Sequence, residues 1–425
     1  KLLISALQQL LAIMAATIAV PAIIGNGMSA SAALFGAGVG TIVYLLFTRF
    51  KSPVFLGSSF AFLGSMSAAF AGGVSMSAGY LGLLIGAVFA GLVYVVIAVI
   101  VKFAGVKWIN KLMPAVVIGP TVAIIGLSLA GNAIGDLMKG NVFNAADAML
   151  CSPYVALLCG LVTLAVTMIC SVYGKKNLKL FPFVIGILAG YALAAIFTGI
   201  GAAANVDALK IIDFSKFKSM KWLPDFSFIQ AFKGGYSFGD GGSVGTFIGT
   251  IAVAYVPVAF VVFAEHIADH KNLSSIIGTE LLEDPGLSRT LLGDGVGSIC
   301  GAFFGGCPNT TYGESVGCVA ITGNASVVTI FTTAVLAMVI SFFGPFVTFL
   351  ATIPSCVMGG VCVALYGFIA VSGLKMIQKV DLNEHRNLFV VSVILIAGVG
   401  GMSLTFGKVT LTEVACALIL GILTN

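Results

Sequence analysis

Five ionisable side chains lie in parts of this sequence that are otherwise apolar. Four of them end an uncharged run that covers residues 246–264, and they are Glu265, His266, Asp269 and His270. The fifth, Glu314, lies in a segment interrupted by proline and glycine, residues 308–315. A charged side chain at the centre of a bilayer costs about 2.5–3.5 kcal/mol on insertion scales, so such residues mark functional sites. These side chains are therefore candidates for a binding site inside a membrane.

The spacing of the first four residues separates the acids from the histidines. On a helix, Glu265 and Asp269 are four positions apart and share one face, and His266 and His270 form a second pair turned by one position. The alternative for Asp269 and His270 is that they only reach the headgroups at the end of a span. Asp294, in another apolar segment, either orders neighbouring helices or takes part in proton coupling.

A metal site is a weaker interpretation of the same residues. Histidines at i and i+4 with an intervening acid resemble an inverted zinc-protease motif. A catalytic zinc ion needs a third protein ligand, and the remaining histidine, His385, lies in an expected loop. None of the nine cysteines forms a C-x-x-C pair. We expect no metal and no disulfide framework.

The composition places the whole chain in a membrane. It is 59% hydrophobic and 9% charged, whereas soluble domains carry about 25% charged residues. We expect an all-α polytopic protein with about 14 transmembrane segments of roughly 20 residues each. The net charge of +5 is spread over short loops, so no nucleic-acid partner is expected. Most lysines and arginines fall in alternate loops, which predicts that both termini are cytoplasmic.

The two halves of the chain repeat one another. Residues 57–62 (GSSFAF) and 309–314 (NTTYGE) share two hydroxyl residues, an aromatic residue and a small residue in the same order. Pro114 and Pro354 are each followed at the same spacing by a Gly-Pro or Gly-Gly pair. The polar loop 201–245 separates the halves. Seven segments in each half require an inverted repeat, and paired interrupted segments indicate a transporter binding site.

The interrupted segments predict the chemistry of that site. Gly313 can expose its backbone N–H, and Ser59 with Phe60 marks a similar break in the first half. Free N–H groups together with carboxylates complement a planar ring with alternating N–H and C=O groups, such as an imide. Phe60 and Tyr312 could supply its flat walls. The alternative is that these segments are only small-residue packing sites, and the residues alone leave the substrate open.

The chain resembles the nucleobase–ascorbate transporter family, and within it the bacterial uracil–proton symporters. The segments that carry the resemblance are 56–62 (LGSSFAF), 264–266 (AEH), 284–289 (DPGLSR), 308–314 (PNTTYGE), 358–360 (MGG) and 365–367 (LYG). The resemblance implies two inverted repeats of seven segments, with short strands in segments 3 and 10. It implies a core domain (1–105 and 246–350), a gate domain (106–200 and 351–425) and an extracytoplasmic loop (201–245). It also implies a homodimer formed through the gate domain.

The resemblance also implies roles for single residues. Glu265 and Glu314 correspond to carboxylates that bind the uracil ring, and the N–H groups of Phe60 and Gly313 face its carbonyls. Three further residues belong to the expected substrate site, namely Ser59, Tyr312 and Tyr366. The expected proton-coupling residues are Glu265, Asp269 and Asp294.

Three positions depart from the family pattern. Uracil symporters can carry histidine where this chain has Asp269. Members often have asparagine at the position of Ser315, and a first-segment histidine at the position of Gln9. Purine-specific relatives commonly carry glutamine at the position of Glu314, so the acid favours uracil.

We therefore expect a proton-coupled uracil permease of the inner cell membrane, surrounded by lipid, with H⁺ as the coupling ion and no cofactor. The alternatives are a xanthine or purine permease, an anion transporter on the same fold, and a membrane metalloenzyme. An anion transporter would need a basic residue at the pocket, and none is near Glu314 or Phe60 in the sequence.

Overall fold

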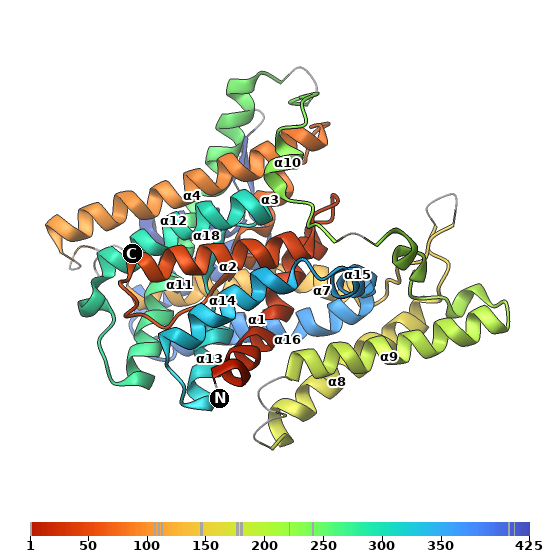
Figure 1. The fold of residues 1–425 in the computed structure, drawn as a ribbon. Helices are drawn as coiled ribbons and strands as arrows, with labels where there is room; N and C mark the ends of the chain where they lie inside the picture. The colour runs from red at the N-terminus through yellow and green to blue at the C-terminus, as the bar shows by residue number, and fades with distance from the viewer. Residues whose placement is uncertain are drawn as a thin grey trace. The chain divides into compact units, whose positions relative to one another are not determined.

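The protein folds into two compact units. The computed structural model describes residues 2–105, 108, 111, 114–144, 148–175, 178, 182–220, 222–239, 242–406, 409–411 and 413–425. The first unit comprises Lys1–Ser128, Pro224–Val339 and Ile369–Asn425, and the second comprises Leu129–Leu223 and Ile340–Phe368. Each unit is described separately below (Figure 1).

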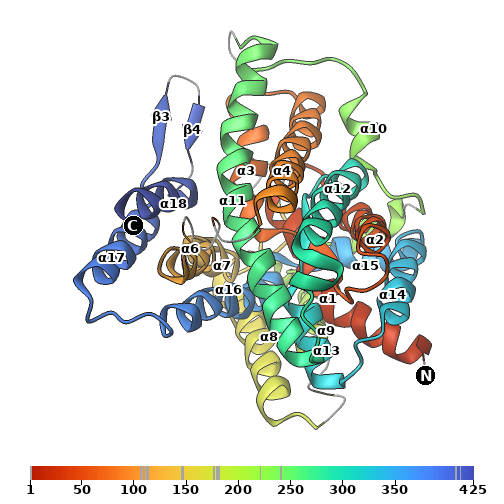
Figure 2. The ribbon, with the colours of Figure 1, turned by 90° about the vertical axis from the view of Figure 1, so that its left-hand side faces the viewer.

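Helices dominate the first unit. They are α1 (Leu2–Ile24), α2 (Ala30–Phe47), η1 (Phe60–Phe62), α3 (Leu63–Ala69), α4 (Met76–Ala104), α6 (Ala115–Ser128), α10 (Ser227–Ala231), α11 (Val244–Ile277), η5 (Leu282–Gly286), α12 (Leu287–Gly305), α13 (Gly313–Thr322), α14 (Val327–Ile340, whose last residue is counted with the second unit), the end of α16 (Ser355–Ile377), α17 (His385–Val399) and α18 (Glu413–Thr424). Two short hairpin strands, β3 (Leu404–Phe406) and β4 (Val409–Leu411), precede α18 (Figure 2).

Several of these helices have the length and composition of membrane spans. Within the described residues, eight helices are long and apolar enough to cross a membrane, or nine if α14 and α15 (Gly344–Thr352) form one bent span. The other expected spans contain shorter helices. One example is the segment in which η1 and α3 follow a strand.

Glycine brings α2, α4 and α12 into close contact. A Cβ atom on Gly36 of α2 would lie 2.3 Å from the backbone oxygen of Gly301 on α12. A Cβ atom on Gly91 of α4 would lie 2.6 Å from the oxygen of Gly295, also on α12. No larger residue fits at these crossings without moving a backbone. Small residues at helix interfaces are how membrane helices approach closely.

Two three-residue strands lie at the centre of the first unit. Strand β1 (Leu56–Ser58) pairs antiparallel with β2 (Asn309–Thr311), with Leu56 opposite Thr311. The Ser59 N–H donates to Pro308 O at 3.0 Å, and the Tyr312 N–H donates to Phe55 O at 3.2 Å. A helix follows each strand, η1 in one case and α13 in the other. The expected strands in the two interrupted segments are therefore confirmed.

The repeated prolines also have matching local structure. Helix α6 begins one residue after Pro114, and α16 begins one residue after Pro354. The oxygen of Pro114 accepts hydrogen bonds from the N–H groups of residues 117 and 118. The oxygen of Pro354 accepts from residues 357 and 358 in the same way. The proline and glycine pattern that is repeated in the sequence thus marks the start of a helix in both places.

The second unit is built around two long helices. These are α8 (Pro153–Tyr173) and α9 (Pro182–Ala203), which lie side by side (Figure 1). The unit also contains α7 (Ala130–Asp136), η3 (Asp207–Leu209), η4 (Phe214–Ser219), α15 and the first part of α16. Thus the expected polar loop 201–245 contains short helical turns, and its second part, from Pro224 onwards, belongs to the first unit.

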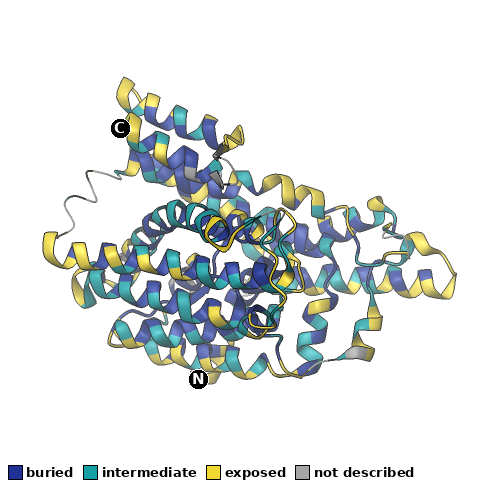
Figure 3. Ribbon diagram, turned by 90° about the horizontal axis from the view of Figure 1, so that it is seen from above, coloured by how far each residue is buried: buried dark blue, intermediate teal, exposed yellow. Residues whose placement is uncertain are grey.

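Apolar side chains cover the outside as well as the inside. Exposed residues follow the outer faces and ends of helices (Figure 3), and they include Phe103 at 82% exposure and Ile396 at 75%. Such large apolar side chains would be unfavourable in water, but they suit hydrocarbon. The distribution fits a chain surrounded by lipid.

Candidate functional site

Helix α11 carries the acids and the histidines on different faces. Its side chains at 266 and 270 are fully buried, whereas Glu265 and Asp269 are partly exposed. The alternative that His270 reaches the headgroups is therefore wrong. The four-residue spacing produces this separation, because positions i and i+4 stack on one side of a helix.

Asp269 contacts the second strand directly. The hydroxyl of Thr311 donates to Asp269 Oδ2 at 2.7 Å. Gly313, two residues further on, is so close that a Cβ atom there would lie 3.9 Å from Asp269 Oδ1. The end of β2 and the start of α13 therefore pack against the acidic face of α11.

Three acids converge at this point. Glu265 is within electrostatic reach of Asp269 and of Glu314, which is the second residue of α13. The structure therefore brings together four residues that the sequence singled out, Glu265, Asp269, Gly313 and Glu314. The first N–H groups of a helix have no partner within the helix, so the start of α13 also offers donors. Among the described residues, no lysine or arginine forms an ion pair with these acids.

The aromatic candidates have structural contacts of their own. The Tyr312 hydroxyl donates to Ser58 O at 2.8 Å, and its ring covers Gly57, where a Cβ atom would lie 2.3 Å from the ring. Tyr312 thus fastens β2 to β1. Ser59 and Phe60 are buried at the start of η1. Tyr366 is buried on the part of α16 that belongs to the second unit.

His266 forms a buried pair with Asp294. His266 Nδ1 lies 2.6 Å from Asp294 Oδ2, and His266 Nε2 lies 3.0 Å from Thr290 Oγ1. The Thr290 hydroxyl donates to Leu287 O, so its oxygen must accept the hydrogen of Nε2. A proton must then lie between Nδ1 and Oδ2, because two bare acceptors would repel at 2.6 Å. Asp294 thus contacts His266, and its other oxygen is buried without a partner.

His270 belongs to a second buried group. Its Nδ1 donates to His266 O at 2.8 Å, and its Nε2 lies 2.7 Å from the Tyr44 hydroxyl. The same hydroxyl lies 2.7 Å from Ser52 Oγ. The sequence does not single out Tyr44, Ser52 or Thr290, because their partners are far away in the chain and their own segments show no unusual pattern. Thr311 belongs to the repeated segment 309–314, but that pattern does not predict its hydrogen bond to Asp269.

The imidazole nitrogens of His266 and His270 thus contact protein groups, and the two rings do not point at a shared ligand position. Within the part of the chain that the structure describes, no group of three or more His, Cys, Asp or Glu side chains is placed to hold a metal ion.

Comparison with known proteins identifies the family. The family model Xan_ur_permease, described as "Permease family", matches residues 1–406. The chain belongs to this permease family. It is therefore a multi-pass membrane transporter and not an enzyme.

Members of this permease family with curated names are similar over nearly their whole length. The uracil permease of Bacillus caldolyticus is 39% identical over 424 residues, covering 99% of this chain and 90% of that protein. The uracil permease of Bacillus subtilis (strain 168) is 38% identical, with 99% and 90% coverage. The uracil permease of Escherichia coli (strain K12) is 35% identical, with 98% and 88% coverage.

Solved structures show that the permease shares its fold with transporters of other families. The transmembrane domain of a cyanobacterium bicarbonate transporter, BicA, matches with a TM-score of 0.63 and 15% identity, covering 98% of this chain and 96% of that one. SLC26A9 matches with a TM-score of 0.66 and 12% identity, covering 99% and 64%. At this identity the likeness concerns the fold alone.

Proposed function

We propose that this permease imports uracil together with protons across the cytoplasmic membrane. The observation that carries the proposal is that Glu265, Asp269 and Glu314 lie near one another at the start of α13. The names of the similar proteins support uracil as the substrate.

Uracil suits this arrangement chemically. Its ring edge presents N–H groups that carboxylate oxygens accept, and carbonyl oxygens that backbone N–H groups can meet. Glu265 and Glu314 take the first role, and the N–H groups of Phe60 and Gly313 take the second. Ser59 and Tyr312, which lie in the same unit, complete the proposed site, and the role that the resemblance implies for Tyr366 stays a prediction. The acids, with no basic partner among the described residues, argue against an anionic substrate.

The same acids supply a place for the proton. A buried carboxylate without a cation is costly, and a proton removes the charge. We propose that Glu265 or Asp269 holds the transported proton while the pocket faces outward, and that its release inward weakens uracil binding. Asp294 supports this site through its contact with His266, with which it shares a proton.

The energy of one proton is sufficient for uphill uptake. A proton moving through about 100 mV supplies about 2.3 kcal/mol. At about 1.4 kcal/mol per tenfold, this allows roughly 45-fold accumulation of a neutral substrate.

The proposed architecture follows the family. We propose 14 segments in two inverted repeats, core and gate domains with the boundaries given above, cytoplasmic termini and a homodimer formed by the gate domains. The antiparallel pairing of β1 with β2 and the matching helix starts after Pro114 and Pro354 support the repeat.

Uracil uptake into proteoliposomes tests the proposal when pH and Na⁺ gradients are imposed separately. We expect accumulation with an inward proton gradient alone, and competition by uracil analogues in preference to xanthine. Glu265→Gln and Glu314→Gln should each abolish uphill uptake, whereas Glu280→Gln, at an exposed position, should retain it. Accumulation driven only by Na⁺, or normal uphill uptake by Glu265→Gln, would contradict the proposal.

A further inference from the structure

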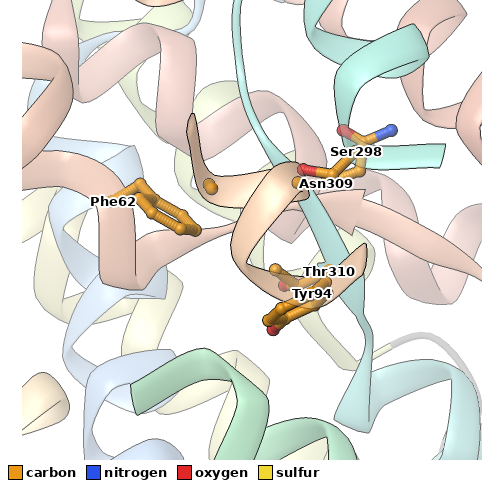
Figure 4. Close-up of a pocket in the computed structure, with 7 residues that line it drawn as sticks. Phe62, Tyr94, Ser298, Asn309 and Thr310 are labelled. Carbon is orange, nitrogen blue, oxygen red and sulfur yellow. The ribbon is translucent and has the colours of Figure 1, made fainter. Parts of the chain in front are cut away.

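A small cavity lies behind the paired strands, inside the first unit. It is lined by buried residues of four elements, namely Phe62 of η1, Ala90, Gly91 and Tyr94 of α4, Ser298 of α12, and Asn309 and Thr310 of β2 (Figure 4). The volume of the cavity is about 10 Å³. A cavity of this size is close to the smallest that can hold one water molecule.

One of the lining residues, Tyr94, has a buried hydroxyl that lacks a partner. Tyr94 is 3% exposed, and its hydroxyl makes no hydrogen bond. The ring cannot easily turn away, because it packs edge-on against Phe263 and His266, at centroid distances of 6.5 and 6.1 Å. A buried hydroxyl without a partner costs about 1–3 kcal/mol by mutational measures, so such groups in native proteins normally have an ordered water as a partner.

Other polar groups surround the same space. The Asn309 amide nitrogen donates to Gly36 O at 3.1 Å, which directs the nitrogen between α2 and α12 and leaves the amide oxygen as an acceptor. Ser298 and Thr310 each add a hydroxyl that can donate or accept. A buried water typically has two to four partners, and four of the lining residues carry side-chain oxygens.

From these observations we propose that the cavity is a binding site for one ordered water molecule, held by Tyr94, Ser298, Asn309 and Thr310. The water accepts the Tyr94 hydrogen and donates to the Asn309 amide oxygen. A sodium ion fits the chemistry less well, because it cannot accept a hydrogen bond from Tyr94.

The proposed water has a definite structural role. It joins α4 and α12 to β2, whose last residue, Thr311, donates a hydrogen bond to Asp269. The inference does not depend on which substrate is transported, since it rests on the cavity and the unpartnered hydroxyl alone.

X-ray hydroxyl-radical footprinting of the purified full-length permease tests this site, because radicals formed from bound water label the buried side chains beside it. We expect Tyr94 and Phe62 to be labelled several-fold faster than Tyr255, which is also fully buried with an unpartnered hydroxyl. Equal labelling of Tyr94, Phe62 and Tyr255 would overturn the proposal.

Two variants with the same chemical change sharpen the test. Tyr94→Phe removes a partner of the water, so labelling of Phe62 should fall several-fold. Tyr255→Phe serves as the control, since Tyr255 stacks on Phe62 at 5.5 Å but does not line the cavity, and labelling of Phe62 should persist. Unchanged labelling of Phe62 in Tyr94→Phe would refute the assignment to water. In the unsubstituted permease, a fall in Phe62 labelling when NaCl replaces choline chloride would also refute it, because sodium would then displace the water.

Discussion

Gln9 of α1 donates a hydrogen bond to the hydroxyl of Ser315 in α13, with 2.5 Å between Nε2 and Oγ. The same amide nitrogen lies 3.3 Å from Ser315 O, and the Phe55 N–H donates to the Ser315 hydroxyl at 3.4 Å. Gln9 and Ser315 are two positions at which the resemblance implies a departure from the family pattern. Their contact shows that the two departures form one structural unit, and that this unit fixes the residue beside Glu314.

Loss of this contact should weaken uracil binding. Gln9→Ala removes one of the two donors to the buried Ser315 hydroxyl, at a cost of about 0.5–1.5 kcal/mol, and allows the first turn of α13 to shift. We expect a rise of up to roughly tenfold in the uracil Kd, measured by binding to purified protein.

A double-mutant cycle provides the control for Gln9. If the effect passes through Ser315, then Gln9→Ala should add little to Ser315→Ala. Additive losses in the two variants would show that Gln9 acts by another route.

The contact between Thr311 and Asp269 predicts an effect on coupling. Thr311→Val keeps the shape of the side chain but removes the hydroxyl that donates to Asp269 Oδ2. We expect lower uphill uptake driven by a proton gradient, while exchange of labelled for unlabelled uracil continues. Thr332→Val, at a partly exposed helix position with a hydroxyl bonded to Val328 O, is the matched control. Equal loss of exchange and uphill uptake in Thr311→Val would contradict a specific role in coupling.

The sequence predicted the part of the site that has a periodic or repeated pattern. The i, i+4 spacing placed Glu265 and Asp269 on one face, and the repeat between 57–62 and 309–314 predicted two interrupted segments. The structure has both, with β1 and β2 paired. Local pattern was sufficient here because helix geometry and backbone breaks are encoded by neighbouring residues.

The partners of the histidines could not be predicted in this way. His266 pairs with Asp294, 28 residues away, and His270 with Tyr44, 226 residues away. Such pairs depend on which helices pack together, and that packing depends on glycine crossings between α2, α4 and α12. The sequence contains 53 glycines, and nothing local distinguishes those at crossings.

The buried pair of His266 and Asp294 should control stability. Asp294→Ala leaves the imidazole buried without its partner, and removing one member of a buried pair costs about 3–5 kcal/mol. Asp294→Asn should cost much less, since its amide group can still donate to Nδ1. Thermal unfolding of purified protein, followed as Tm, measures both. A similar Tm for the two variants would show that the hydrogen bond to His266 contributes little.

The glycine crossing of α2 and α12 gives the sharpest packing prediction. In Gly36→Ala, the new Cβ atom would lie 2.3 Å from Gly301 O, so one helix must move away from the other. Because β2 and Asn309 pack on the same pair of helices, we expect loss of folded protein and of uracil binding together. The control is Gly199→Ala in α9, where a Cβ atom meets nothing within 4 Å and alanine favours the helix. Both variants are compared by size-exclusion chromatography and Tm in the same detergent, and a normal Tm for Gly36→Ala would mean that the helices do not approach as closely as described.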